Sequence, residues 1–143
     1  MKPPLIILSL FLALVTCVFA TSSPVDAQAS KPSDAYKQFL ARLYWAKQLK
    51  DFTFCMQEST RTHMESLTGQ EARDAFLRYK RSYVAKFKVI KEEVVEDRAF
   101  IEGEGIAVES GQRVKAHVRA QMVREGGAWK VMFTNWSGTI YGR

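Results

Sequence analysis

Histidine and cysteine, the side chains on which most zinc sites depend, are scarce in this sequence. There are two of each among 143 residues. His63, His117 and Cys55 have none of the spacings that hold a tetrahedral zinc ion. The sequence also lacks a Gly-x-Ser-x-Gly nucleophile motif and a lysine-bearing phosphate loop. We therefore expect no metal, no cofactor and no catalytic residues.

The sequence has no apolar run of the length that usually spans a bilayer. The uncharged run Leu5–Ala20 is sixteen residues long, whereas about 18 or more are needed. Lys2 before it and small residues after it are typical of a secretory signal peptide. Cleavage after Ala20 and cleavage after Ala29 both fit the small-x-small pattern. The sequence thus predicts export, to a bacterial periplasm.

Two alternatives to soluble export remain open. The stretch Leu14-Val15-Thr16-Cys17 resembles a bacterial lipobox, in which Cys17 would be lipidated and anchor the protein. The segment could also remain uncleaved as an anchor. We expect membrane contact only if Cys17 is lipidated.

The rest of the chain predicts one domain. Residues 1–29 form the signal peptide and flexible leader, and residues 30–143 form a single folded domain of a size that can bury a core. Without Cys17, Cys55 has no intramolecular disulfide partner, so the fold must rest on this core. We expect Cys55 to be buried as a small apolar residue, with a disulfide to a partner as the alternative.

Apolar periodicity predicts three helices in the first half of the domain. The first begins at Ser33 or Asp34 and runs to about Leu49. The second spans Phe54–Leu67. The third follows a capping box formed by Thr68 and Glu71.

The second half predicts an antiparallel meander of four strands. The first contains Val89 and Val95, and the others span Ala99–Val108, Gln112–Glu125 and Ala128–Ile140. Gly126-Gly127 between two alternating runs is a strong hairpin signal. Gly103 and Gly105 inside a strand predict a bulge, a bend or a close backbone approach. The fold class is therefore α+β, with three N-terminal helices packed on a curved antiparallel sheet of about four strands.

A two-residue turn at Gly126-Gly127 also predicts which side chains share a face. Counted outward from it, Val118, Ala120, Trp129 and Phe133 fall on the buried face. Met122 is opposite Val131, Ala120 opposite Phe133 and Val118 opposite Asn135. On the other face, Gln121 is opposite Met132, Arg119 opposite Thr134 and His117 opposite Trp136. The candidate site is therefore an open face carrying Arg113, Lys115, His117, Arg119 and Trp136.

The element order and the closing Gly-Gly-Ala-Trp-Lys-Val resemble the nuclear-transport-factor-2-like superfamily of cystatin-like α+β cones, in its small exported bacterial type. The resemblance covers Asp34–Ile140. It implies that the helices cover the concave face of the sheet and leave a convex face where a protein partner or a second copy docks. It also implies an alternative, an enzyme or small-ligand carrier using the cavity between helices and sheet. The candidate cavity residues form no catalytic pattern: Tyr36, Tyr44, Asp51, Tyr83 and Asn135.

Together these features predict an exported, non-enzymatic binding protein of the cell envelope. It would engage a protein partner, as an envelope accessory or an immunity-type inhibitor, with a homodimer through the sheet face as a further option. The net charge of +6 favours an acidic partner. Export and the acidic residues of the preceding hairpin argue against nucleic acid. Those acids also leave a simpler interpretation open, a solvated strand face paired with them: Glu92, Glu93, Glu96, Asp97, Glu102, Glu104 and Glu109.

Overall fold

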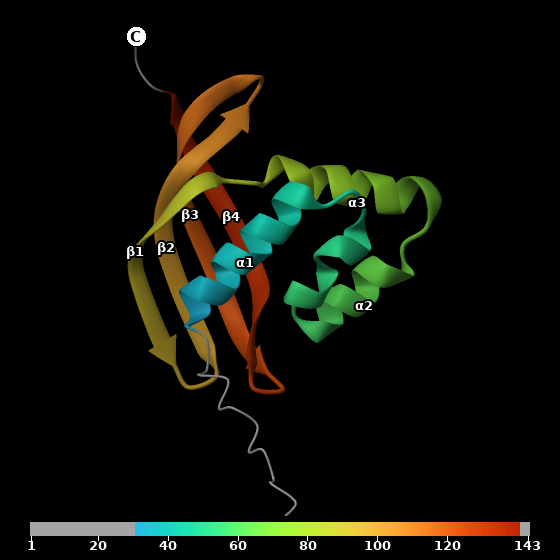
Figure 1. Cartoon of the computed structure of the whole chain (residues 1–143), viewed down its shortest axis with the longest axis horizontal. Coiled ribbons are helices and arrows are strands. Elements are labelled where there is room, and N and C mark those ends of the chain that lie inside the picture. The colour runs from blue at the N-terminus through green and yellow to red at the C-terminus, as the bar shows by residue number, and fades with distance from the viewer. Residues whose placement is uncertain (1–30, 141–143) are drawn as a thin grey trace, which may run out of the picture.

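The computed structural model describes residues 31–140 and has the α+β architecture that the sequence predicts (Figure 1). Three α-helices pack on one face of a four-stranded antiparallel sheet in the order β1-β2-β3-β4. The helical segments are α1 (Pro32–Trp45), η1 (Leu49–Asp51), η2 (Thr53–Cys55), α2 (Glu58–Ser66) and α3 (Gly69–Arg81). The strands are β1 (Ala85–Val95), β2 (Arg98–Glu109), β3 (Gln112–Glu125) and β4 (Ala128–Ile140).

The expected signal peptide, leader and lipidation site at Cys17 lie outside the described residues. Of the helices formed by residues 31–140, none is both long and apolar enough to cross a membrane.

Helix α1 is shorter than predicted and ends at Trp45, because Ala46 takes up an extended conformation. The ammonium group of Lys80, on α3, donates hydrogen bonds to the last carbonyl groups of α1. Its Nζ lies 2.9 Å from the oxygen of Leu43, 2.7 Å from that of Tyr44 and 3.3 Å from that of Ala46. A cation at this point satisfies carbonyls that have no partner within the helix and opposes the negative end of the helix dipole.

The second predicted helix is divided. Met56 is extended and buried, and it forms a bridge with Val131 of β4. The amide of Gln57 donates to the carbonyl oxygen of Val131 at 2.9 Å. This pairing interrupts the helix, so η2 precedes Met56 and α2 begins only at Glu58.

The capping box predicted at Thr68 is not formed. Thr68 is the N-cap residue of α3, but its side chain makes no capping hydrogen bond. A reciprocal capping box forms instead at η1, between Gln48 and Asp51. The Asp51 carboxylate accepts from the backbone amides of Lys47 and Gln48 at 2.7 and 3.1 Å. These bonds, that from Lys47 foremost, hold the pKa of Asp51 below its usual value.

The core lies between α1 and the concave face of the sheet. Tyr36, Phe39 and Leu43 of α1 are fully buried there, against the small side chains of Ala116 and Ala120 on β3. Small residues on the strands leave room for the aromatic rings of the helices. Val118, Ala120 and Trp129 are buried, as the alternation predicts.

The sheet is strongly bent, and the two interior glycines of β2 allow it. The register of β1 against β2 shifts twice, between Ala85 and Lys88 and between Val89 and Lys91. A Cβ atom on Gly103 would overlap the ring of Phe87, so a side chain has no space there. The prediction of a bulge or close approach at these glycines is confirmed.

The β3–β4 hairpin forms at Gly126-Gly127 as predicted, with φ angles of 57° and 79°. The predicted register is correct for Met122 and Val131 but wrong beyond them. A bulge at Met132 shifts the pairing by one residue, so that Phe133 lies opposite Gln121 and Trp136 opposite Val118. An extra residue on one strand reverses the face of every residue after it.

Candidate binding surface on the convex sheet face

The convex face of the sheet carries the basic residues predicted for the site. Arg113, Lys115 and Arg119 are exposed, and His117 is half-buried among them. The residues between them point inward, since Val114, Ala116, Val118 and Ala120 are buried. In the described part of the chain, the helices lie on the opposite, concave face (Figure 1). The structure thus brings these four residues together on an open surface.

Trp136 does not belong to this surface. Because the bulge at Met132 reverses the end of β4, Trp136 faces inward and packs, partly buried, against the core. Phe133 moves the other way. The alternation predicts it in the core, but its side chain is 50% exposed.

The neighbouring strand, β2, carries acidic residues directly opposite the basic residues of β3. Glu102 on β2 lies opposite Arg119, and Glu104 lies opposite His117. Nζ of Lys115 lies 3.0 Å from Oε1 of Glu104, and Nε of Arg119 lies 4.0 Å from Oε1 of Glu102. Part of the basic face therefore pairs within the sheet, as the simpler interpretation predicts. Such exposed pairs contribute little to stability.

Reasoning from the sequence missed an apolar row on the same face. Phe100 on β2 lies opposite Gln121 on β3, and Phe133 on β4 lies opposite Gln121 on the other side. The two phenylalanines are 42% and 50% exposed. Large exposed apolar side chains are a common mark of interaction surfaces. Phe133, on the edge strand, also borders the cleft between α2, α3 and β4. A signal was present in the sequence, since Trp129 and Trp136 are seven positions apart. In a regular strand, residues an odd number of positions apart lie on opposite faces. Both tryptophans can face the core only if a bulge lies between them.

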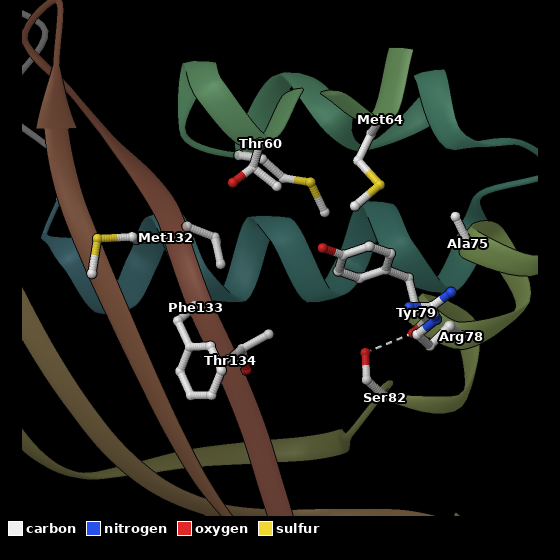
Figure 2. A pocket seen from close by; sticks show the side chains of 11 residues that line it. Thr60, Met64, Ala75, Arg78, Tyr79, Ser82, Met132, Phe133 and Thr134 are labelled. Carbon is white, nitrogen blue, oxygen red and sulfur yellow. Dashed lines mark hydrogen bonds between the residues drawn. The ribbon is translucent and has the colours of Figure 1, made fainter. Parts of the chain in front are cut away.

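A second candidate is a cleft of about 270 Å³ between α2, α3 and β4. Thr60 and Met64 of α2 and Tyr79 of α3 point into it, and Thr134 faces them from β4 (Figure 2). Burial raises the pKa of Tyr79, so its hydroxyl stays protonated. The lining offers an apolar wall with a few hydroxyl groups and the guanidinium group of Arg78.

The cavity residues expected from the family resemblance do not converge in this cleft. Tyr36 is buried in the core, and its hydroxyl bonds Oγ1 of Thr134. Tyr44 and Tyr83 contact each other near the end of α1, with ring centroids 5.2 Å apart. Asp51 lies in a surface turn, and Asn135 faces outward opposite Arg119.

Cys55 is half-buried and forms no disulfide within residues 31–140, so the expectation of a buried thiol holds in part. Burial raises its pKa, which keeps the thiol protonated and weakly nucleophilic. Among residues 31–140, no three His, Cys, Asp or Glu side chains are grouped so as to hold a metal ion.

No protein-family model matches this sequence, and no curated protein matches it. Solved structures resemble it in fold. A designed nuclear-transport-factor-2-like protein, Rd1NTF2_05 with five substitutions, is 14% identical and has a TM-score of 0.53, over 73% of this chain and 95% of its own. A SEC-C motif containing protein from Rhodopseudomonas palustris is 13% identical and has a TM-score of 0.50, over 75% and 79%. The fold is therefore a nuclear-transport-factor-2-like α+β cone.

Proposed function

We propose that this protein is an exported, non-enzymatic binding protein of the bacterial cell envelope, and that a protein partner docks on the convex face of its sheet. The observation that carries the proposal is the apolar row. Phe100 and Phe133 stand half-exposed on either side of Gln121, on an open face with charged residues at its next levels. Apolar side chains within a polar rim are the usual anatomy of a protein interface. The separation of the candidate cavity residues favours binding over catalysis.

A second copy of the chain is the partner that fits this face best on charge. Acidic β2 and basic β3 lie side by side, with Glu102 level with Arg119. A two-fold axis that runs along the strands between β2 and β3 places β2 of each copy over β3 of the other, at the same level. Glu102 of each copy then faces Arg119 of the other, and Phe100 faces Gln121. Opposite charges then meet twice near the centre of the contact, once at each Glu102–Arg119 pair.

Sedimentation equilibrium of charge-reversed variants tests this arrangement. The wild-type chain should dimerise, and Arg119→Glu should weaken the dimer because it sets two carboxylates against each other. Adding Glu102→Arg to that variant should restore dimerisation, since the charges are then exchanged. Lys37→Glu, on α1 away from the sheet face, is the control and should leave the dimer intact. A wild-type chain that stays monomeric at high concentration would exclude the second copy.

Export is supported by Lys2 and the apolar run Leu5–Ala20. Mass spectrometry of the mature protein should find a start at Thr21 or Ser30, or a diacylated Cys17 as the first residue. Recovery of the unprocessed chain from the cytoplasm would contradict export.

The cleft favours one further candidate function, carriage of a small apolar ligand. Its volume of about 270 Å³ is near the lower end of ligand pockets. Met64→Trp would fill it. If the cleft is used, this variant should abolish binding of an apolar fluorescent dye that the wild-type chain retains.

A further inference from the structure

One end of the molecule exposes an unusual amount of aromatic and aliphatic surface. Trp45 is 78% exposed, Val108 60%, Tyr44 52% and Leu77 44%. Tryptophan is highly buried on average in folded proteins, so this exposure calls for a partner. These four residues and Tyr83 are called the aromatic end below.

The five side chains form one continuous surface although they come from different elements. The ring centroid of Tyr44 is 4.9 Å from that of Trp45 and 5.2 Å from that of Tyr83. Tyr83, Leu77 and Val108 line a common groove of about 420 Å³. In Figure 1 the C-terminal ends of α1 and α3 lie beside each other, next to the sheet.

Cations surround this surface. Arg81 and Arg113 line the same groove as Leu77 and Val108. Lys47, Lys50 and Arg73 line an adjoining groove that also contains Leu77. All five are exposed, and within the described chain none forms a salt bridge with a carboxylate. Beyond its backbone hydrogen bond, Lys47 does act through its charge on the nearby Asp51 carboxylate and helps to lower its pKa. Glu65 is the acid of the adjoining groove, and its Oε1 accepts a hydrogen bond from the Thr53 hydroxyl at 3.1 Å.

The charge at the end of α1 next to Trp45 is also compatible with contact with an anionic surface. The C-terminal carbonyls of a helix carry partial negative charge, which would be repelled by anions. Here the ammonium group of Lys80 donates hydrogen bonds to three of these carbonyls, those of Leu43, Tyr44 and Ala46. The negative end of α1 is thereby covered by a positive charge.

We propose that the aromatic end docks on the surface of an anionic phospholipid bilayer. Tryptophan and tyrosine favour the boundary between the headgroups and the acyl chains, because their rings are apolar with one polar edge. Lysine and arginine around them attract anionic headgroups. The site needs no lipid on Cys17, and of the convex face it shares only Val108 and Arg113, which no variant in its test changes. The vesicle-binding test of this site can therefore fail or succeed whatever the outcome of the test of the proposed function.

Vesicle binding by the full chain tests the proposal. Vesicles of phosphatidylcholine alone are compared with vesicles that contain equal parts of phosphatidylcholine and phosphatidylglycerol. The wild-type chain should bind the anionic vesicles more tightly, and its tryptophan emission should shift to the blue. Trp45 should give this shift, because Trp129 is buried and Trp136 is packed against the core. Trp45→Phe should therefore remove the shift and retain most of the binding.

Two pairs of variants decide whether the named residues carry the binding. Lys47→Gln with Lys50→Gln should weaken it about fivefold for each cation, or about 25-fold together. Lys37→Gln with Lys91→Gln removes the same charge elsewhere and should leave binding unchanged. Trp45→Ala should weaken it at least about tenfold, because a ring of about 100 Å² no longer enters the interface, whereas Val95→Ala, at another exposed position, should not.

Every variant carries the same residues 1–30, so a difference in affinity between variants comes from the substituted residues. The proposal is wrong if the wild-type chain binds neutral and anionic vesicles equally. It is also wrong if the Lys47/Lys50 and Trp45→Ala variants bind as tightly as the wild-type chain.

Discussion

The hydroxyl oxygen of Tyr36 lies 2.7 Å from Oγ1 of Thr134, so a side-chain hydrogen bond joins α1 to β4 across 98 positions of the chain. Thr134 can make this bond only because the bulge at Met132 turns it toward the concave face. The bond therefore reports on the register of the second half of β4.

Tyr36→Phe removes this bond and keeps the ring. We expect it to lower the free energy of unfolding by about 1 kcal/mol, because Thr134 loses its partner in a partly buried place. Urea denaturation measures the loss. Thr134→Val in the Tyr36→Phe background should cost little more, whereas fully additive losses would mean that the two residues do not interact.

The free energy of unfolding should fall at alkaline pH, because the buried phenol of Tyr36 resists ionisation in the folded chain. Burial raises its pKa from 10.0 to about 12. As pH rises above 10, the phenol ionises first in the unfolded chain, so folding loses free energy until the folded phenol ionises as well. The contribution of Tyr36 is present in full below pH 10 and falls by about 2–3 kcal/mol by pH 12.

Urea denaturation of the wild-type and Tyr36→Phe chains across that range measures this contribution. The pKa values of Tyr79 and Tyr83 are also raised by burial, and both remain in the variant. The difference between the two chains thus isolates Tyr36. Parallel pH profiles would contradict the raised pKa.

Phe133→Ala should have almost no effect on folding. The side chain is 50% exposed, so its removal leaves no core cavity and should cost less than about 1 kcal/mol. Phe39→Ala is the matched control, since Phe39 is fully buried, and should cost about 3–5 kcal/mol. Thermal unfolding compares the two, and a large loss in Phe133→Ala would place that ring in the core after all.

Gly103→Ala should destabilise the sheet although it adds only a methyl group. The new Cβ would lie 2.6 Å from the carbonyl oxygen of Lys88 and overlap the Phe87 ring. We expect a loss of about 2–3 kcal/mol, since backbone must move to relieve the contact. Glu104→Ala, next to it on the open face, should cost less than about 1 kcal/mol; equal losses would show that the bend does not depend on Gly103.

Alternation and turn chemistry were enough to predict the sheet. β3 and β4 begin and end at the predicted residues, because Gly126-Gly127 favours a tight hairpin turn and the side chains of β3 alternate strictly. The position of the basic residues follows from the same pattern. These are local signals, and a single sequence contains them in full.

The errors came from contacts between distant segments. Met56 interrupts a helix because it pairs with Val131, and nothing near Met56 in the sequence reveals that partner. The run Val131-Met132-Phe133 is uniformly apolar, so alternation within it cannot show where an extra residue enters. The bulge there moved Trp136 out of the predicted site and Phe133 into the open face. The aromatic end was missed because Tyr44, Leu77 and Val108 meet only in three dimensions.

The hairpin of β2 and β3 pairs without a single shift from Arg98 to Glu109. This uninterrupted pairing has a consequence for a pair of copies related by an axis along the strands. Such an axis keeps the strand direction of both copies, so both direct the β2–β3 turn, and with it the groove lined by Leu77 and Tyr83, to the same side. A dimer would then present two membrane-binding sites to one bilayer. Once the first site is bound, the second would bind at a high effective concentration. The apparent affinity for the membrane would therefore rise with protein concentration, as the fraction of dimer increases.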